Sequence, residues 1–422
     1  MRQSQLFTKI KKEVPSGEVA KNAQLLLQAG FIHKEMAGVY SFLPLGLRVI
    51  ENIKQIIRKE LNAAGCQEMC MTALQSKAIW EKTNRWSDDV VDNWFKTTLK
   101  NGTELGLAFT HEESIAQIMS NYVHSYKDLP FFAYQFQTKF RNELRAKSGI
   151  MRGREFLMKD LYSFHTDKKA HDEFYEKMKE VYMEIFRTLG LGDNTYLTMS
   201  SGEPFSKYSF EFQTISEAGE DTILFDKEKK VAINKDDFSD QIFIDFGLNK
   251  DEYNFEEAKS IEIGDIYSLG TKYSEALNLT YADAEGKNHP VFMGSYGIGI
   301  SRVMGTIVEV CNDKNGMIWP EEVAPFAVHL VSLCVEDSDV AKVDALYQKL
   351  VDAGVSVLYD DRDLRPGQKF AESDIIGIPH RVIMSKKTMQ DNSVEYIDRK
   401  AGNTEFLTAD DVVRLTASWQ SS

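Results

Sequence analysis

The sequence predicts an α+β protein, with an antiparallel sheet flanked by helices in its larger part and a smaller α/β domain at its end. Two long segments, residues 46–64 and 168–189, repeat apolar residues at helical spacing. Between them, residues 131–140 and 156–164 are rich in aromatic residues, as expected of strands. Because these strands follow one another instead of alternating with helices, we expect them to pair as an antiparallel sheet.

The rest of the chain extends this pattern and then changes it after Pro320. Further strands are expected at 68–74, 208–215, 221–225 and 291–296. After Pro320, predicted strands and helices alternate, which is typical of a mainly parallel sheet of about 100 residues. We therefore expect a first part at 1–225, a polar and weakly periodic insertion at 226–261, a continuation of the first part at 262–322, and the α/β domain at 323–422.

The charge balance and the cysteine content exclude several classes of protein. The 422 residues include 50 Lys and Arg against 64 Asp and Glu, a net charge of −14. This charge argues against a protein that binds nucleic acid with its whole surface, although it is compatible with a local basic patch. We expect neither a membrane helix nor a signal peptide, because long apolar runs are missing. Four cysteines without zinc-site spacing predict reduced thiols and a cytoplasmic location.

Three short segments combine arginine with residues suited to nucleotides. In Phe140-Arg141-Asn142-Glu143, an arginine able to hold a phosphate stands two positions before a carboxylate able to accept from an amino group. In Arg152-Gly153-Arg154-Glu155-Phe156, an aromatic ring beside arginines can stack on a base. In residues 293–302, glycines precede Arg302 at a predicted turn from strand to helix, where a ligand can approach the backbone. Each segment alone also fits an ordinary surface arginine.

A nicotinamide-dependent dehydrogenase is the alternative that Gly297 and Gly299 suggest. A dinucleotide-binding fingerprint needs another glycine three positions after the second, and Arg302 stands there. In addition, no strand–helix–strand unit frames an acidic partner about 20 residues downstream. We therefore reject this alternative.

Together, the three segments resemble motifs 2 and 3 of class II aminoacyl-tRNA synthetases, and the chain is similar to the bacterial prolyl-tRNA synthetase family. The similarity is carried by Ala108–Glu113, Gln137–Arg141, Arg154–His165, Leu269–Ser274, Met293–Gly299, Asp360–Gly367 and Ile376–His380. It implies a class II catalytic domain in 1–225 and 262–322, an anticodon-binding domain in 323–422, and the activity of an ATP-dependent proline–tRNA ligase.

The resemblance implies that Arg141 and Arg302 are the catalytic residues. Arg141 would hold the α-phosphate of ATP and the carboxylate of proline, and Arg302 would hold the γ-phosphate. Because that carboxylate is already a nucleophile, the enzyme has to hold two anions together and stabilise charge on the phosphates. The implied ATP-binding residues are Arg141, Glu143, Arg154, Phe156, Glu211, Gln213 and Arg302. Mg²⁺ is the implied cofactor, with Glu211 as its protein ligand.

For the amino acid, the resemblance points to a Thr-x-Glu element that would hold the imino group of L-proline. The same residues also fit a helix N-cap followed by acidic first-turn residues, and the other pocket residues also fit ordinary strand positions in a core. The implied proline-binding residues are Thr110, Glu112, Arg141, Met158, Asp160, Tyr162, Gly294 and Ser295.

The expected partner is tRNA(Pro). Its implied contacts are Arg145, Lys147, Arg152, Arg362, Arg365 and Lys369, although a charged loop with internal ion pairs is the alternative for those in the C-terminal domain. Long bacterial members of the family carry an editing domain between motifs 2 and 3, because a pocket for proline admits smaller amino acids such as alanine. Since the segment 226–261 is far too short for such a domain, we expect the short form, without post-transfer proofreading.

The resemblance also implies a homodimer, and a few positions depart from the family pattern. Thr72 stands where motif 1 usually has proline, which affects the expected dimer interface. Ser295 replaces a usual cysteine, Asp265 replaces Asn or His, and the histidine usual before Glu211 is missing. Two other functions remain open: a non-catalytic paralogue that binds RNA or regulates, and a synthetase for another amino acid such as threonine or serine.

Overall fold

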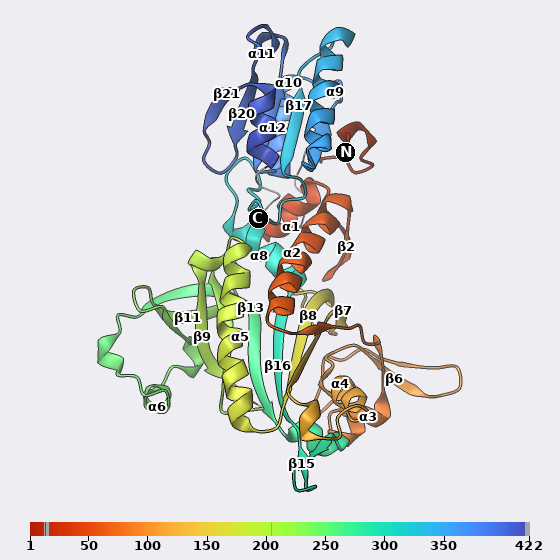
Figure 1. The fold of residues 1–422 in the computed structure, drawn as a ribbon, viewed down its shortest axis with the longest axis vertical. Coiled ribbons are helices and arrows are strands. Elements are labelled where there is room, and N and C mark those ends of the chain that lie inside the picture. Colours follow the sequence, from red (N-terminus) through yellow and green to blue (C-terminus); the bar gives the residue numbers. More distant parts are fainter. Residues whose placement is uncertain (12, 14–16, 204, 418–422) are drawn as a thin grey trace. The chain divides into compact units, whose positions relative to one another are not determined.

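A sheet of nine strands contains the aromatic strands predicted between the two long helices (Figure 1). The computed structural model describes residues 1–11, 13, 17–203 and 205–417. The strands lie in the spatial order β10 (Tyr208–Ile215), β9 (Thr195–Ser201), β12 (Val231–Asn234), β11 (Asp221–Asp226), β13 (Glu256–Gly270), β16 (Phe292–Gly299), β8 (Glu155–His165), β7 (Phe131–Phe140) and β3 (Gln67–Glu68). Neighbours are antiparallel except for β9–β12 and β3–β7, and β10 also pairs with β13. The predicted antiparallel sheet is therefore confirmed.

Helix α5 (Lys168–Thr188) packs on this sheet, against β8, β9, β13 and β16. Asp167 caps its first turn by accepting a hydrogen bond from the main-chain N–H of Ala170 at 2.9 Å. Phe174, Met178 and Ile185 repeat at helical spacing and are buried. The helix therefore covers one face of the sheet and leaves the other to the candidate site.

Several smaller elements accompany the nine-stranded sheet. Two further small sheets are β4–β6–β5 (Leu74–Ser76, Glu104–Leu107, Lys96–Thr98) and β14–β15 (Thr280–Ala282, Asn288–Pro290), and β1 (Ile32–Met36) pairs with β2 (Val39–Phe42). The helices outside the C-terminal domain, besides α5, are α1 (Lys21–Gln28), α2 (Pro44–Ala63), α3 (Lys77–Lys82), α4 (Glu112–Met119), α6 (Asp240–Asp245), α7 (Lys272–Leu277) and α8 (Ile300–Val310).

A second sheet of five strands occupies the C-terminal part of the chain. Its strands lie in the order β18 (Val357–Asp360), β17 (Val328–Ser332), β19 (His380–Met384), β20 (Val394–Asp398) and β21 (Thr404–Leu407). The first three are parallel, as predicted, and the last two are antiparallel additions that the prediction did not contain. The accompanying helices are α9 (Asp337–Asp352), α10 (Pro366–Ile376), α11 (Lys386–Gln390) and α12 (Ala409–Ala417).

One predicted strand was wrong in detail. The strand expected at 68–74 is broken, because Met71 donates its main-chain N–H to the side chain of Gln135 instead of to a neighbouring strand. The segment 226–261, expected as an insertion on the first part, contributes Val231–Asn234 and Glu256–Ile261 to strands of the nine-stranded sheet, where Ala232 and Ile233 are buried.

The chain forms two compact units whose limits differ from the linear domains that we predicted. One unit contains residues 35–40 and 53–306, and the other contains residues 1–34, 41–52 and 307–422. In the second unit, Phe31 stacks on Trp319 with ring centroids 5.5 Å apart, and Asn22 donates to Glu309. These packed and hydrogen-bonded contacts explain why N-terminal residues group with the C-terminal sheet. Among the residues described, no helix combines the length and the apolar composition needed to cross a bilayer.

Candidate functional site

A cavity of about 280 Å³ opens on the face of the nine-stranded sheet, within one compact unit. Its floor comes from β8, β13 and β16, and its walls come from the β7–β8 loop, the β10–β11 turn and the start of α8. Arg141, Phe156, Asp265 and Arg302 line it. We call it the arginine cavity.

The floor stays low because Gly297 has no side chain. A Cβ atom at this position would lie 2.5 Å from the Asp265 carboxylate and 2.6 Å from the methyl group of Met158. The register of the sheet places Gly297 between Asp160 on β8 and Asp265 on β13. The glycine therefore lets the Asp265 carboxylate and the Met158 methyl group pack directly against the strand, and its main-chain N–H donates to that carboxylate at 3.2 Å.

Arg141 follows the last residue of β7 and lies between two aromatic rings. Its guanidinium carbon is 5.0 Å from the ring centre of Phe109 and 5.3 Å from that of Phe156. Its Nε is buried and has no hydrogen-bond partner within the described part of the chain. Burial and the nearby Arg302 lower the pKa of Arg141. An arginine with this much unused hydrogen-bonding capacity suits an anionic ligand.

Arg302, on the first turn of α8, is only partly engaged by the protein. Its Nε donates to the main-chain oxygen of Met151 at 3.0 Å, and its Nη1 donates to that of Glu262 at 2.7 Å. The Glu262 carboxylate is 3.4 Å from Nη1. These contacts orient the guanidinium toward the cavity, which Arg302 also lines.

The loop between β7 and β8 is held by ion pairs and main-chain acceptors. Arg152 pairs with Glu143 and with Glu220, each at 2.9 Å. Arg154 donates to the main-chain oxygens of Ala37 and of two loop residues, Glu143 and Leu144. Of the residues predicted for ATP and tRNA, Glu143 and Arg152 line the cavity, but Arg154 does not: it braces the loop.

Carboxylates gather along the β10–β13 side of the cavity. The register places Glu211 beside Asp265, and Gln213 beside Glu262. Burial and the charge of Glu262 raise the pKa of Glu211 and of Asp265, each to about 7. Gln213 donates to Glu211 at 2.9 Å, and its own side-chain oxygen is buried without a partner. This side therefore concentrates negative charge: Glu262 and Asp265 line the cavity, whereas Glu211 and Gln213 stand next to them on β10 and do not line it.

The carboxylates on this side suit a metal cation that is bound partly by the protein and partly by the phosphates of a bound nucleotide. Within residues 1–11, 13, 17–203 and 205–417, no three or more His, Cys, Asp or Glu side chains converge as a metal site. Mg²⁺, however, is commonly held by one or two carboxylates together with substrate phosphates. Glu211 and the unused Gln213 oxygen fit that kind of site.

The Thr-x-Glu element lies at the start of α4, and Glu112 gathers three neutral hydroxyl groups. Thr110 donates to its Oε2 at 2.6 Å, while Ser295 and Tyr162 donate to its Oε1 at 3.3 and 3.4 Å. Burial and the Glu112 charge raise the pKa of Tyr162 well above its ordinary range, so this phenol stays a donor. We call these four residues the Glu112 cluster.

The nearest cation to the cluster is Arg85, whose Nη1 is 3.8 Å from the Glu112 carboxylate. Arg85 pairs more closely with Glu113, at 2.9 Å, and donates to Tyr273. Glu112 is 6% exposed. A buried carboxylate whose ion pair with Arg85 is long, at 3.8 Å, is a suitable partner for a ligand ammonium group.

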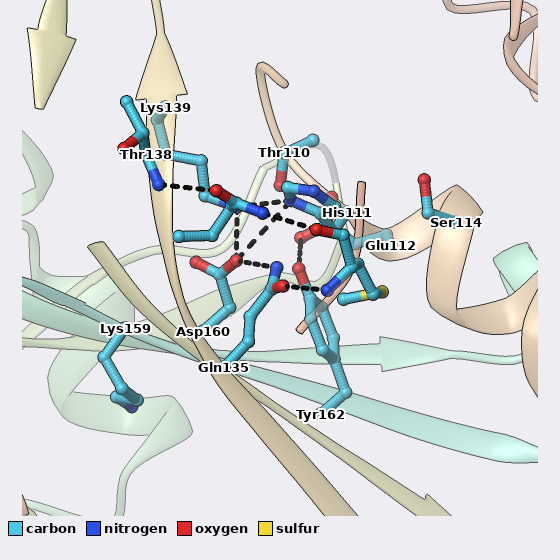
Figure 2. A network of polar contacts seen from close by, with 12 residues as sticks. Thr110, His111, Glu112, Ser114, Gln135, Thr138, Lys139, Lys159, Asp160 and Tyr162 are labelled. Atoms are coloured by element: carbon cyan, nitrogen blue, oxygen red, sulfur yellow. Dashed lines mark hydrogen bonds and ion pairs between the residues drawn. The ribbon is translucent and has the colours of Figure 1, made fainter. Parts of the chain in front are cut away.

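Figure 2 shows that Asp160 belongs to a second, fully paired network beside the cluster. Its carboxylate contacts Lys139 and accepts from Gln135 at 2.9 Å, and Lys139 also contacts Nδ1 of His111. Nε2 of His111 is 3.1 Å from the main-chain oxygen of Thr72. In this structure Asp160 is therefore occupied by an ion pair.

The two remaining pocket predictions separate. Met158 lines the arginine cavity. Gly294 faces the other side of the sheet from Ser295, because a Cβ atom there would meet the Tyr296 hydroxyl and Ser163. Gly294 therefore does not form a floor together with Ser295.

The basic residues predicted to bind tRNA differ in how free they are. Arg145 and Arg365 are exposed, and Lys147 is 3.4 Å from Glu220. Lys369 is only 3% exposed and donates to the main-chain oxygen of Ser332 at 2.7 Å. Arg362 is held by Asp360 and Glu372, both at 2.8 Å. In this structure Lys369 and Arg362 are engaged by partners inside the C-terminal fold, whereas Arg145 and Arg365 are exposed.

Comparison with known proteins gives the class of this fold and site. Residues 95–311 match the model of the tRNA synthetase class II core domain (G, H, P, S and T), and residues 328–418 match the anticodon binding domain. The protein is thus a class II tRNA synthetase by its domains.

Curated relatives give the family. A proline–tRNA ligase from Maricaulis maris is 38% identical, with 99% of this chain and 98% of the relative covered. One from Rickettsia akari is also 38% identical, with 97% and 98% covered. The chain belongs to the proline–tRNA ligase family.

A solved structure agrees at the level of the fold. Prolyl-tRNA synthetase from Cryptosporidium parvum, solved in complex with L-proline and AMP, matches with a TM-score of 0.76 at 17% identity. The match covers 95% of this chain and 75% of that one. The class II fold expected from the sequence is confirmed.

Proposed function

We propose that this protein is an ATP-dependent proline–tRNA ligase that forms prolyl-adenylate in the arginine cavity and transfers the prolyl group to tRNA(Pro). The observation that carries the proposal is the position of Arg141. It lines the cavity with unused hydrogen-bonding capacity, and it lies against Phe109, one residue before Thr110 of the Glu112 cluster. One guanidinium can therefore face both the nucleotide and the amino acid.

In this mechanism the protein orients two anions and stabilises charge. The ammonium group of proline lies against Glu112 and Thr110, and its carboxylate points to Arg141. The carboxylate attacks the α-phosphate, a bond to pyrophosphate breaks, and Arg141 and Arg302 stabilise the negative charge on the phosphates. Holding both reactants in one place supplies much of the rate enhancement.

The adenine would stack on Phe156, whose ring lines the cavity. Glu143 would accept from the exocyclic amino group of the base. Since Glu143 is paired with Arg152 here, we expect the carboxylate to share its two oxygens between that arginine and the base. Ser295 in the place of the usual cysteine keeps a donor to Glu112 at 3.3 Å.

Mg²⁺ would be held by Glu211 and the phosphates of ATP. When bound, it would neutralise phosphate charge and favour the bent nucleotide. The excess negative charge formed by Glu211, Glu262 and Asp265 supports a cation at this side. Gln213 would orient the Glu211 carboxylate through its hydrogen bond.

For tRNA, we propose that exposed basic residues make the contacts. Arg145 and Lys147 lie in the β7–β8 loop, beside the cavity, and would meet the acceptor end. Arg365, exposed at the start of α10, would contact the anticodon stem or loop. We also propose a cytoplasmic homodimer, as the family resemblance implies, and size-exclusion chromatography with light scattering tests the dimer.

Absence of post-transfer editing is part of the proposal. The segment 226–261 is built partly into the central sheet, which leaves little chain for a hydrolytic domain. We expect alanyl-tRNA(Pro) to be deacylated no faster with the purified protein than in a control without protein. Rapid deacylation would contradict this part.

ATP–pyrophosphate exchange tests the function. It is measured separately with each of the 20 amino acids. We expect exchange with proline, and weaker exchange with alanine at high concentration. No exchange with any amino acid would favour a non-catalytic paralogue. A preference for threonine or serine would overturn the assignment of the substrate.

A further inference from the structure

A buried ion pair between Lys139 and Asp160 lies beside the Glu112 cluster. Lys139 is 1% exposed on β7, and Asp160 is 5% exposed on β8. Burying an ammonium group costs free energy unless it is paired and hydrogen-bonded. Here Lys139 contacts both the Asp160 carboxylate and the imidazole of His111 (Figure 2).

These contacts fix which nitrogen of His111 carries the proton. An ammonium group can only donate, so Nδ1 of His111, which it contacts, must be the acceptor. The main-chain oxygen of Thr72 can only accept, so Nε2, at 3.1 Å, must carry the hydrogen. The imidazole is therefore neutral and bridges the sheet to the chain at Thr72.

His111 stands between the two residues that would hold the ammonium group of proline. Thr110 precedes it, Glu112 follows it, and α4 begins at Glu112. Its side chain is fully buried, and both its nitrogens are used. Fixing this one ring therefore fixes the direction of its two neighbours.

We propose that Lys139, Asp160 and His111 act together as positioning residues, which hold Thr110 and Glu112 in the geometry that binds the substrate ammonium group. The inference rests on the proposed proline site at the Glu112 cluster and deepens it. Asp160, expected to touch proline, acts through Lys139 and His111 instead. Gln135 supports it by donating to Asp160 at 2.9 Å and accepting from the N–H of Met71.

A matched control stands one residue away on β8. Lys159 is also completely buried, but it points away from the network (Figure 2) and donates to the main-chain oxygen of Tyr296 at 2.9 Å. A Lys159→Met variant therefore loses a buried, hydrogen-bonded amino group without touching His111. Comparing it with Lys139→Met separates positioning from general destabilisation.

The kinetic test is ATP–pyrophosphate exchange with both variants. We expect Lys139→Met to raise the KM for proline at least about 10-fold at pH 8, with the KM for ATP within about two-fold of wild type. We expect Lys159→Met to lower the melting temperature with the KM for proline within about two-fold. Equal effects of the two variants on the KM for proline, or equal effects of Lys139→Met on both substrates, would overturn the proposal.

The pH dependence gives a second signature. The titratable or charged groups that face His111 are Lys139 on β7, Asp160 and Tyr162 on β8, and Glu112 on α4. Burial and Lys139 lower the pKa of His111 to about 4. Without Lys139, the two carboxylates raise it, and a protonated imidazole can pair with Asp160 at low pH. The ratio of the KM for proline of Lys139→Met to that of wild type should therefore rise between pH 6 and pH 8, and a constant ratio would contradict the proposal.

A spectroscopic measurement on the wild-type protein tests the proposal even if the Lys139→Met variant does not fold. In ¹⁵N-histidine NMR spectra assigned with His111→Gln, we expect the neutral Nε2–H tautomer of His111 from pH 6 to pH 8. A charged imidazole or the Nδ1–H tautomer would overturn the proposal. This readout does not depend on catalysis, whereas missing exchange by the wild type would instead overturn the proposed function.

Discussion

The arginine cavity and the Lys139–Asp160 network lie on the same face of one sheet, yet they treat charge in opposite ways. In the network, Lys139, Asp160 and His111 satisfy one another and are almost fully buried. In the cavity, Arg141 has an unused Nε, and Asp265 has its pKa raised to about 7 because it is buried near Glu262. Paired charges hold other residues of the protein in position. Charges left unpaired can bind a ligand.

The two arginines near the cavity repeat this contrast. Arg154 was expected to bind ATP, but it donates to three main-chain oxygens and braces the loop. Arg141 makes no side-chain hydrogen bond within the part of the chain that the structure describes. Variants of paired and of unpaired residues test this contrast. Removing a paired charge should mainly change stability, and removing an unpaired one should mainly change catalysis or binding.

The largest effect is expected for Arg141→Ala. Removing a preorganised group that stabilises transition-state charge costs about 3–4 kcal/mol, so kcat/KM in ATP–pyrophosphate exchange should fall roughly 100- to 1000-fold. The melting temperature should change less than in Arg154→Ala, because the guanidinium stacks on Phe109 and Phe156 and its Nε has no hydrogen-bond partner within the described residues. Arg187→Ala, on the exposed side of α5, is the control and should leave both quantities unchanged.

Arg154→Ala should show the reverse pattern. The loss of three main-chain contacts should lower the melting temperature, and its effect on kcat/KM should be smaller than that of Arg141→Ala. If Arg154→Ala abolishes exchange with an unchanged melting temperature, Arg154 contacts ATP directly and the distinction between the two arginines is wrong.

Glu112→Gln should have the next largest effect, on proline alone. A hydrogen bond to a charged group is worth about 1.5–3 kcal/mol, so the KM for proline should rise roughly 10- to 100-fold. The KM for ATP should stay within about two-fold, because the Glu112 cluster does not line the cavity. Glu104→Gln, at an exposed ion pair with Lys77, is the matched control. Equal changes in both KM values would show that Glu112 acts on the whole site.

Asp265→Asn should change how stability depends on pH. Burial and Glu262 hold the pKa of Asp265 at about 7, above its value in the unfolded chain, so the folded state binds more protons between about pH 4 and pH 7. The free energy of unfolding should therefore fall as the pH rises through this range. The variant should reduce that fall by about 1–2 kcal/mol, measured by urea unfolding at pH 5.5 and pH 8.

Asp128→Asn is the control for this measurement. Main-chain N–H groups of His124 and Ser125 lower the pKa of Asp128, so it stays ionised over the whole range. Its variant should keep the wild-type pH dependence. If Asp265→Asn also keeps it, the carboxylates of the cavity are not strained by their mutual repulsion.

The smallest effect applies the same contrast to the C-terminal sheet. Arg365 is exposed, so Arg365→Ala should raise the KM for tRNA(Pro) only about three-fold and leave the melting temperature unchanged. Lys369 is buried against Ser332 and Asp360, so Lys369→Ala should lower the melting temperature. A strong loss of tRNA binding by a stable Lys369→Ala variant would contradict the assignment of paired charges to the fold.

Sequence periodicity predicted the main elements well, because it records which face of an element is buried. The strand expected at 131–140 is β7 with the same limits, and the helix expected at 168–189 ends one residue earlier. Strands β20 and β21 were missed, since Val394–Asp398 and Thr404–Leu407 are short and separated by charged turn residues.

The site was predicted less completely, because side-chain partners come from distant segments. Nothing near Lys369 in the sequence indicates that it reaches Ser332, and nothing near Arg154 indicates Ala37. One signal was available: Gln135, Gln137 and Lys139 alternate on an otherwise aromatic strand. Polar residues at every second position of such a strand indicate a polar, ligand-facing surface.

A crystal structure with L-proline and a non-hydrolysable ATP analogue tests the central claim most directly. The account predicts the triphosphate between Arg141 and Arg302, the ammonium group of proline on Glu112 and Thr110, and an unchanged Lys139–Asp160 pair. A triphosphate outside the two arginines, or a Lys139–Asp160 pair that opens to contact proline, would contradict it.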